Sequence, residues 1–149
     1  MYIIVVGGGK VGYYLSRDLL ERGEEVLLIE KDATRADWLS SQLGSIVLKG
    51  DGDEMSFLST TGMERADVVM AVTGDDEDNL IALQLAKTRF HVKKTIARVN
   101  NPANVRIFKI LGVDEAISAT ELLLDAIEPK IGETHHADHH HPHRPRTGG

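Results

Sequence analysis

The chain has 149 residues, a formal net charge of −6, 42% hydrophobic and 27% charged residues, and no cysteine. This is the composition of an ordinary globular domain, and it excludes a disulfide framework, a thiol nucleophile and a cysteine-ligated metal or cluster. The acidic balance, without a basic stripe, argues against nucleic-acid binding. No apolar run approaches the roughly 20 residues that cross a bilayer, so we expect a cytoplasmic protein without membrane insertion.

Short apolar runs alternate with amphipathic stretches along the chain. Strands are predicted at residues 2–6, 25–29, 45–48, 67–72, 95–99 and 115–117. Helices are predicted at residues 11–22, 34–43, 54–60, 79–90 and 103–111, with a last helix from about 121 to 131. The strand cores are continuously apolar, which is typical of parallel strands covered on both faces. We therefore predict an α/β fold: a Rossmann-like, doubly wound parallel sheet of six strands in the order 3-2-1-4-5-6.

Turn-forming residues agree with these boundaries. Asp32 precedes the second helix and is expected to cap it, and Pro102 suits the first turn of the fifth helix, where a missing N–H costs nothing. Glycines follow four of the predicted helices, at Gly23, Gly44, Gly62 and Gly112. Glycine is the residue that most often ends a helix.

The first predicted strand runs into a glycine-rich turn that reads Gly7-Gly8-Gly9-Lys10-Val11-Gly12. Gly7, Gly9 and Gly12 fit the G-x-G-x-x-G spacing, in which the glycines allow a tight turn, backbone approach to a pyrophosphate and close helix packing. The helix beginning near Lys10 would direct its free N–H groups toward phosphates. This turn predicts nucleotide binding at the carboxyl ends of the first and fourth strands.

An acidic residue, Glu30, ends the second strand 18 residues after Gly12, close to the spacing at which an acid reaches ribose hydroxyls. Such an acid suits NAD(H) and ATP/ADP alike and disfavours NADP(H), whose 2′-phosphate would meet the carboxylate. Lys31 and Arg35 lie close to Glu30 in sequence and could accept a 2′-phosphate, so the sequence does not exclude NADP(H).

Polar residues also follow the third and fourth strands. Asp51, between two glycines, either accepts from an adenine or ribose group or, like Asp53, caps the helix predicted from residue 54. Thr73 and Asn79 lie where the fourth strand leaves the sheet, so we expect both to approach the ligand. The four acids at 75–78 would repel phosphate, and we interpret them as the first turn of a helix.

An arginine within a strand, Arg98, needs a partner because an isolated buried charge is costly. A phosphate would supply that partner, and Lys10 is a second cation near the same position. We expect Gly12→Asp or Arg98→Ala to abolish nucleotide binding while leaving the fold intact.

The chain offers no evident catalytic apparatus. Six strands and their helices use the sequence to about residue 132, which leaves no room for a second domain with a substrate pocket. We therefore expect a binding protein and not an enzyme. The alternative is the cofactor-binding domain of an NAD-dependent oxidoreductase whose catalytic part lies elsewhere.

Several segments in the same order resemble the RCK or KTN (TrkA-N) nucleotide-binding domain of the Trk/Ktr potassium-uptake systems. They read Val5-Val6-Gly7-Gly8-Gly9-Lys10-Val11-Gly12, Leu28-Ile29-Glu30-Lys31-Asp32, Gly50-Asp51-Gly52, Ala66-Asp67-Val68-Val69-Met70-Ala71-Val72-Thr73, Asp76-Glu77-Asp78-Asn79 and Ile96-Ala97-Arg98-Val99-Asn100. The resemblance implies binding of NAD(H) or ATP/ADP without chemistry, in a regulatory subunit that gates a membrane-embedded potassium channel or transporter. It also implies a homodimer or larger ring, peripheral to the inner face of the membrane through its partner.

The resemblance also implies roles for individual residues. Gly7, Gly9, Lys10 and Gly12 would hold phosphates, Glu30 the ribose, and Asp51 would lie by the adenine. Thr73 and Arg98 would complete the phosphate side, and Glu121 matches a position that faces a divalent cation at a subunit interface in some relatives.

The composition changes at about residue 134. Six of the seven histidines lie in residues 134–149, which have almost no apolar side chains. We assign residues 1–133 to one nucleotide-binding domain and 134–149 to a disordered His-rich tail that binds metal only adventitiously.

Overall fold

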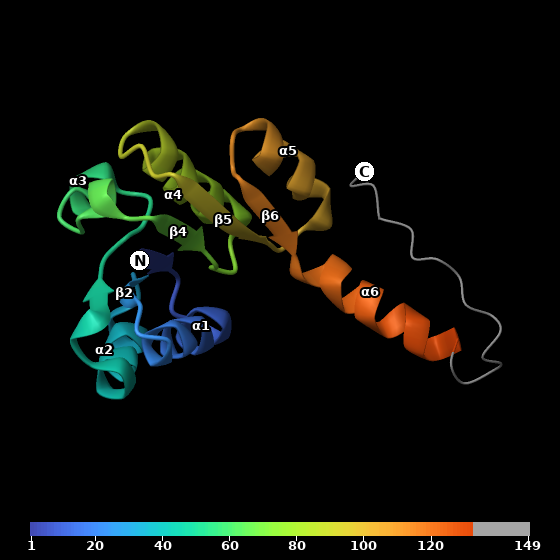
Figure 1. Ribbon diagram of the computed structural model, residues 1–149, viewed down its shortest axis with the longest axis horizontal. Helices are drawn as coiled ribbons and strands as arrows, with labels where there is room; N and C mark the ends of the chain where they lie inside the picture. The colour runs from blue at the N-terminus through green and yellow to red at the C-terminus, as the bar shows by residue number, and fades with distance from the viewer. Residues whose placement is uncertain (133–149) are drawn as a thin grey trace.

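A computed structural model describes residues 1–132 of the chain, so the predicted tail at 134–149 lies outside the described residues. The described part contains one parallel sheet whose strands are β1 (Tyr2–Val6), β2 (Glu25–Glu30), β3 (Val47–Lys49), β4 (Val68–Ala71), β5 (Lys94–Val99) and β6 (Glu115–Ser118). Their order is β3-β2-β1-β4-β5-β6, which confirms the predicted topology (Figure 1).

Helices connect the strands in strict alternation. They are α1 (Lys10–Glu21), α2 (Ala33–Leu43), α3 (Met55–Leu58), α4 (Asp76–Thr88), α5 (Val105–Ile110) and α6 (Ala119–Gly132). Three short 3₁₀ turns, η1 (Gly44–Ile46), η2 (Met63–Arg65) and η3 (Pro102–Asn104), lie in the connections. The prediction started the third strand too early, because η1 occupies those residues, and it started α4 three residues too late.

Caps explain several of these boundaries. Asp32 Oδ2 accepts a 2.7 Å hydrogen bond from Arg35 N, as predicted for the start of α2. Asn101 caps η3, with Pro102 at its first position. The prediction interpreted the acids at 75–78 as a helical first turn but gave the helix bounds from residue 79. In the structure Asp75 is the N-cap and accepts from Asp78 N at 2.9 Å, so α4 begins at Asp76.

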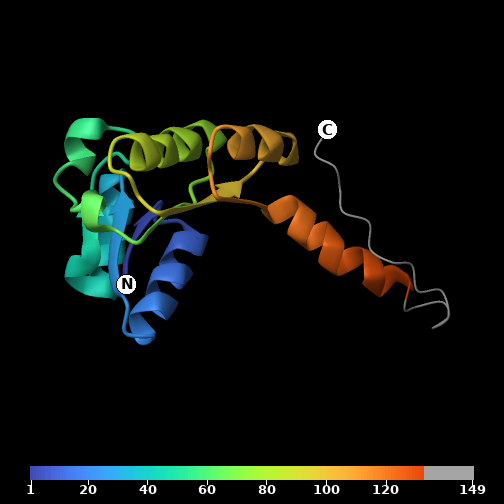
Figure 2. The same ribbon diagram turned by 45° about the horizontal axis from the view of Figure 1, so that its top comes forward.

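Two apolar layers bury the sheet on both faces. Helices α1 and α2 cover one face and α3, α4 and α5 the other (Figures 1 and 2). Ile3 and Val5 of β1 pack in the first layer, while Ile4 and Val6 pack in the second. This alternation explains why a strand that is apolar at every position is buried along its whole length.

The last helix, α6, extends away from the sheet in both views (Figures 1 and 2). None of its residues is buried, and Leu122, Leu123 and Ile127 are 58%, 62% and 51% exposed. Among the described residues, no helix is both long and apolar enough to span a membrane.

Candidate functional site

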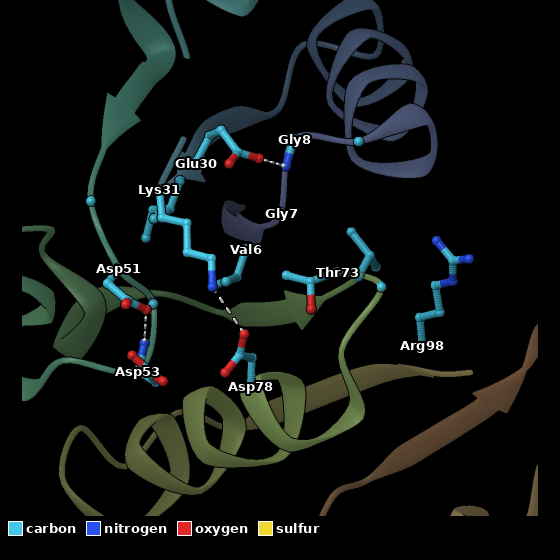
Figure 3. A pocket seen from close by; sticks show the side chains of 16 residues that line it. Val6, Gly7, Gly8, Glu30, Lys31, Asp51, Asp53, Thr73, Asp78 and Arg98 are labelled. Carbon is cyan, nitrogen blue, oxygen red and sulfur yellow. Dashed lines mark hydrogen bonds and ion pairs between the residues drawn. The ribbon is translucent and has the colours of Figure 1, made fainter. Parts of the chain in front are cut away.

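A cleft of about 260 Å³ opens at the carboxyl ends of β1 and β4, where the strand order reverses (Figure 3). Val6 pairs with Ile29 on one side and with Ala71 on the other, so these three strands end at one level. The cleft is lined by seven of the residues predicted from the sequence: Gly7, Gly9, Glu30, Lys31, Asp51, Thr73 and Arg98. The topology therefore gathers segments that are far apart in the sequence at one edge of the sheet.

The glycine-rich turn forms one wall of this cleft. Gly7 has a φ of +110°, which only glycine adopts readily, and its N–H donates to Ile29 O at 2.8 Å. Gly12 lies behind the turn and does not line the cleft; a Cβ there would lie 1.7 Å from Gly7 O. The expectation that Gly12→Asp leaves the fold intact is therefore wrong, because any side chain at this position must displace the turn.

Gly9 differs from both of these glycines. It is the exposed N-cap of α1, its φ of −70° is open to any residue, and apart from its two chain neighbours no described residue has an atom within 4 Å of a Cβ built on it. Neither backbone conformation nor packing within the described residues requires glycine here.

Glu30 ties the turn to the end of β2. One carboxylate oxygen accepts from Gly8 N and the other from Asp32 N, both at 2.8 Å. Each carboxylate oxygen has a second lone pair, so the side chain can still accept from hydroxyl groups in the cleft. Arg35 supports the same turn, since its Nε donates to Gly8 O at 2.6 Å.

Lys10 and Val11, the first two residues of α1, are exposed and do not line the cleft. Only their backbone N–H groups remain as candidates for a ligand. No side chain caps α1, and its first turn contains no acid. This helix N-terminus therefore offers free N–H donors and a positive dipole end.

Asp51 and Asp53 form a pair at the end of the cleft nearest β3. Asp53 N donates to Asp51 Oδ1 at 3.2 Å, and neither side chain caps α3, whose N-cap is Glu54. The capping alternative is therefore not what the structure contains, and both carboxylates line the cleft.

The two carboxyl groups of this pair titrate differently. The pKa of Asp53 is raised to about 6 by its hydrogen bond with Asp51, by partial burial and by the charges of Asp51 and Asp78. The same hydrogen bond lowers the pKa of Asp51. The pair therefore holds a proton more readily than two separate carboxylates would.

Asn79 lies behind the cleft wall and does not line the cleft. Its side chain is fully buried; the amide oxygen accepts from the N–H and hydroxyl of Thr73, and the amide nitrogen donates to Thr73 O and Arg98 O. These side-chain hydrogen bonds tie α4 to Thr73, which follows β4, and to Arg98 of β5, so the observed role of Asn79 is to position Thr73 and Arg98.

Arg98 stands at the other end of the cleft from Asp51 and Asp53 (Figure 3). Its Nε is buried without a hydrogen-bond partner, and its guanidinium makes no ion pair with any described residue. The hydroxyl of Thr73, by contrast, is already engaged with Asp75 O and Asn79. The unsatisfied donor at the cleft edge is therefore Arg98.

No group of three His, Cys, Asp or Glu side chains that could hold a metal occurs within residues 1–132. Glu121 lies in the first turn of α6, where its N–H donates to Ser118 Oγ at 3.1 Å. The metal role of Glu121 stays a prediction.

Sequence reasoning missed several residues that line the cleft, among them Gly8, Asp53, Gly74 and Asp78. Gly74 carries a recognisable signal, because it is a glycine in the turn between β4 and α4; in the structure a Cβ there would meet no neighbouring atom within 4 Å. Asp78 was interpreted only as part of an acidic first turn, and its second role is visible only once the fold brings the start of α4 and the end of β2 to the same cleft.

The TrkA-N domain family matches residues 3–119 of the chain. The chain is 35% identical over 138 residues to the Trk system potassium uptake protein TrkA homolog of Methanothermobacter thermautotrophicus, covering 93% of this chain and 63% of that one. It is 39% identical over 132 residues to the Trk system potassium uptake protein TrkA of Mycobacterium tuberculosis, covering 88% and 60%. The chain thus spans about three-fifths of the length of these curated relatives.

Solved structures share the same fold. The NAD(P)-binding domain of an exopolyphosphatase-related protein from Archaeoglobus fulgidus superposes with a TM-score of 0.76 and 26% identity, covering 88% of this chain and 97% of that one. The GsuK channel bound to NAD superposes with a TM-score of 0.78 and 20% identity, covering 86% of this chain and 23% of that one. GsuK bound to ADP superposes with a TM-score of 0.76 and 20% identity, covering 89% of this chain and 34% of that one.

Proposed function

The chain belongs to the TrkA-N domain family, and from that premise we propose that its cleft binds NAD(H) or ATP/ADP without chemistry, as the sensor of a potassium-transport regulatory protein. Its curated relatives are Trk system potassium uptake proteins, and the fold occurs in the GsuK channel bound to NAD and in GsuK bound to ADP. The ligand and the regulatory role carry over to this chain as a proposal.

The observation that carries the proposal is Gly9. A glycine that neither backbone conformation nor internal packing requires is explained by a group that approaches from outside the protein. At the N-terminus of a helix that group is an anion, because the free N–H groups and the helix dipole both attract negative charge. A pyrophosphate or phosphate over Gly9 satisfies both conditions.

Arg98 and Glu30 support opposite ends of the same ligand. The unpaired guanidinium of Arg98 would bind phosphate, to which arginine presents several donors in a fixed geometry. Glu30 would accept from the ribose hydroxyls, and Asp51 lies beyond it for the base. A nucleotide lying along the carboxyl edge of the sheet therefore meets donors at its phosphates and acceptors at its ribose and base.

Regulation follows if two nucleotides differ in affinity for two conformations of the assembled protein. A tenfold preference corresponds to about 1.4 kcal/mol per site, and several sites in one assembly add their contributions. We propose that this assembly is a homodimer or larger ring on the cytoplasmic side of a membrane-embedded channel or transporter. The exposed leucines of α6 support an assembled state, because apolar helix surfaces of this kind usually lie in interfaces.

The decisive experiment is calorimetric titration of the full chain and of Gly9→Asp with NADH, NAD, ATP and ADP. Asp is a good N-cap, so Gly9→Asp should keep or raise the unfolding free energy by a few tenths of a kcal/mol. Its charge and bulk should nevertheless weaken nucleotide binding at least about 100-fold. A variant that is stable and cannot bind separates the site from the fold.

Ser40→Asp is the matched control, because it adds the same charge at an exposed position of α2 outside the cleft. It should bind as the parent chain does. Nucleotide affinity that survives Gly9→Asp, or the absence of affinity in the parent chain, would overturn the proposal.

A further inference from the structure

Two cations line the cleft among the described residues, and they are held in different ways. The guanidinium of Arg98 has no ion-pair partner, whereas Lys31 Nζ lies 3.2 Å from Asp78 Oδ2. The Lys31 side chain leaves the end of β2 and reaches the first turn of α4, so the pair joins the two halves of the sheet across the cleft (Figure 3).

Lys31 directly follows Glu30, the residue expected to hold the adenosine ribose. A cation at this point of a dinucleotide fold is what a phosphate on the ribose 2′-oxygen requires. Lys31 is thus the side chain in the cleft best placed in sequence to accept such a phosphate.

The charge of Lys31 is already balanced by acids on two sides. The hydrogen bond and charge of Asp78, then the charges of Asp51 and Asp53, raise the pKa of Lys31 and keep it protonated. Together with Glu30, four carboxylates and this one lysine line the ribose and base end of the cleft. A phosphate entering there would meet a net negative field.

Arg35, the other cation close in sequence, is engaged elsewhere. Its Nε donates to Gly8 O at 2.6 Å, and its guanidinium carbon lies 4.5 Å from the centre of the Trp38 ring. Arg35 does not line the cleft. In the sequence, Lys31 and Arg35 were the two cations that kept NADP(H) as a possible ligand. In the structure both are engaged with other groups, so neither is available to a 2′-phosphate.

We infer that Asp78 is a specificity-determining residue: by holding Lys31 across the cleft it withholds the cation that a 2′-phosphate needs, so the cleft favours nucleotides with an unmodified ribose. The inference rests on the proposed nucleotide site and adds to it the residue that selects among nucleotides. Glu30 excludes the 2′-phosphate by direct repulsion, while Asp78 acts through Lys31 from another element of the fold.

The pair is weak enough to be altered by one substitution. The Lys31 side chain is 62% exposed and that of Asp78 30%, and exposed pairs of this kind contribute little to stability. Asp78→Asn therefore should not unfold the chain, and it both frees Lys31 and removes one negative charge. We expect it to lower the ratio of the Kd for NADPH to the Kd for NADH about fivefold to tenfold.

The test measures binding of the full chain to NADH and NADPH, and to AMP and 2′,5′-ADP; each pair differs only by the 2′-phosphate. Glu77→Gln is the matched control, since it removes one charge from the same helical turn but is exposed and outside the cleft lining. In Glu77→Gln, the ratio of the Kd for NADPH to the Kd for NADH should equal that of the parent chain. The double variant Lys31→Met/Asp78→Asn should not show the lowered ratio of Asp78→Asn, because no lysine remains to be released.

An unchanged ratio in Asp78→Asn would overturn the inference while leaving nucleotide binding in place. A gain that persists in the double variant would also overturn it, because the effect would then come from charge alone. If the parent chain binds neither pair, the proposed function itself fails, and the inference fails with it.

Discussion

Two helices, α1 and α4, begin at the same edge of the sheet, yet their N-termini have opposite character. The N-cap of α1 is Gly9, and among the described residues no side chain caps the helix and its first turn contains no acid. The N-cap of α4 is Asp75, whose side chain accepts from Asp78 N, and the first turn contains Asp76, Glu77 and Asp78. The first terminus is open to an anion, and the second already has its own negative charges.

The comparison teaches that a polar residue at a strand end is not evidence of a ligand contact. Around α4, the side chains of Asp75, Asp76 and Asn79 use their hydrogen-bonding capacity within the protein. At the start of α1, Gly9 carries no side chain and the first N–H groups of the helix have no side-chain cap, so these N–H groups remain available to a ligand. The N-terminus of α1, which has fewer polar side chains around it, is therefore the better anion site.

The largest expected effect comes from breaking the α4 side at Asn79. Asn79→Ala leaves the Thr73 N–H and the Arg98 carbonyl without their side-chain partner in a partly buried setting, whereas Thr73 O keeps its hydrogen bond from the Asn100 amide. Each such group costs about 1–3 kcal/mol, so we expect the unfolding free energy to fall by roughly 3 kcal/mol. Urea denaturation measures this change directly.

Gln84→Ala, on the same helix but without a hydrogen bond from its side chain in the described residues, serves as the control and should change stability by less than about 0.5 kcal/mol. If Asn79→Ala were as stable as Gln84→Ala and lost only nucleotide affinity, Asn79 would be a ligand contact, and the contrast between the two helix termini would be wrong.

A smaller and pH-dependent effect is expected at Asp76, which accepts from Asn100 N and its side-chain amide, from Asn101 N and from the Asn104 amide. Burial acts to raise the pKa of Asp76, but these hydrogen bonds outweigh it and lower the pKa. A lowered pKa in the folded state contributes stability above the unfolded pKa, and this stability is lost as pH falls through the folded pKa.

Asp76→Asn should therefore cost about 1 kcal/mol at pH 7, a value discounted for partial exposure, and the difference from the parent chain should shrink toward zero at pH 3. Urea denaturation at both pH values tests this, with Glu77→Gln as the neighbouring control. A cost that is equal at both pH values would mean that the charge of Asp76 is not what joins α4 to the β5–α5 connection.

The sequence predicted the topology and most of the cleft, because apolar runs and glycines report their local structure directly. Gly7, Glu30 and Asp51 were identified from where strands end, and Arg98 from its place inside a strand. Asn79 was expected to approach the ligand, yet it lies behind the cleft wall, and only packing distinguishes a residue that lines the cleft from one that supports it. Gly12 also lies behind the wall, where it allows the close helix packing that the glycine spacing predicted. The pairing of Lys31 with Asp78 spans 47 positions and depends on strand order.

The smallest expected effect concerns the Asp51–Asp53 pair, which makes one end of the cleft sensitive to pH. The pKa of Asp53 is raised to about 6, so between its ordinary value of 3.8 and about 6 the folded chain binds more protons than the unfolded chain. The contribution of Asp53 to the unfolding free energy therefore falls as pH rises through this window, and above about pH 6 both carboxyl groups of the pair are charged and repel each other.

Asp53→Asn removes that repulsion, so it should raise stability at pH 8 by only a few tenths of a kcal/mol, since solvent still reaches this half-buried pair and screens the repulsion. At pH 5 the parent chain already holds a proton there, and the gain should be smaller. Asp51→Asn should behave alike because the proton belongs to the pair, whereas Asp37→Asn, on the exposed side of α2, should show no such dependence. If Asp53→Asn changes the stability equally at pH 5 and pH 8, Lys31 already neutralises the repulsion between the two carboxylates. The charge at this end of the cleft would then be the same at both pH values.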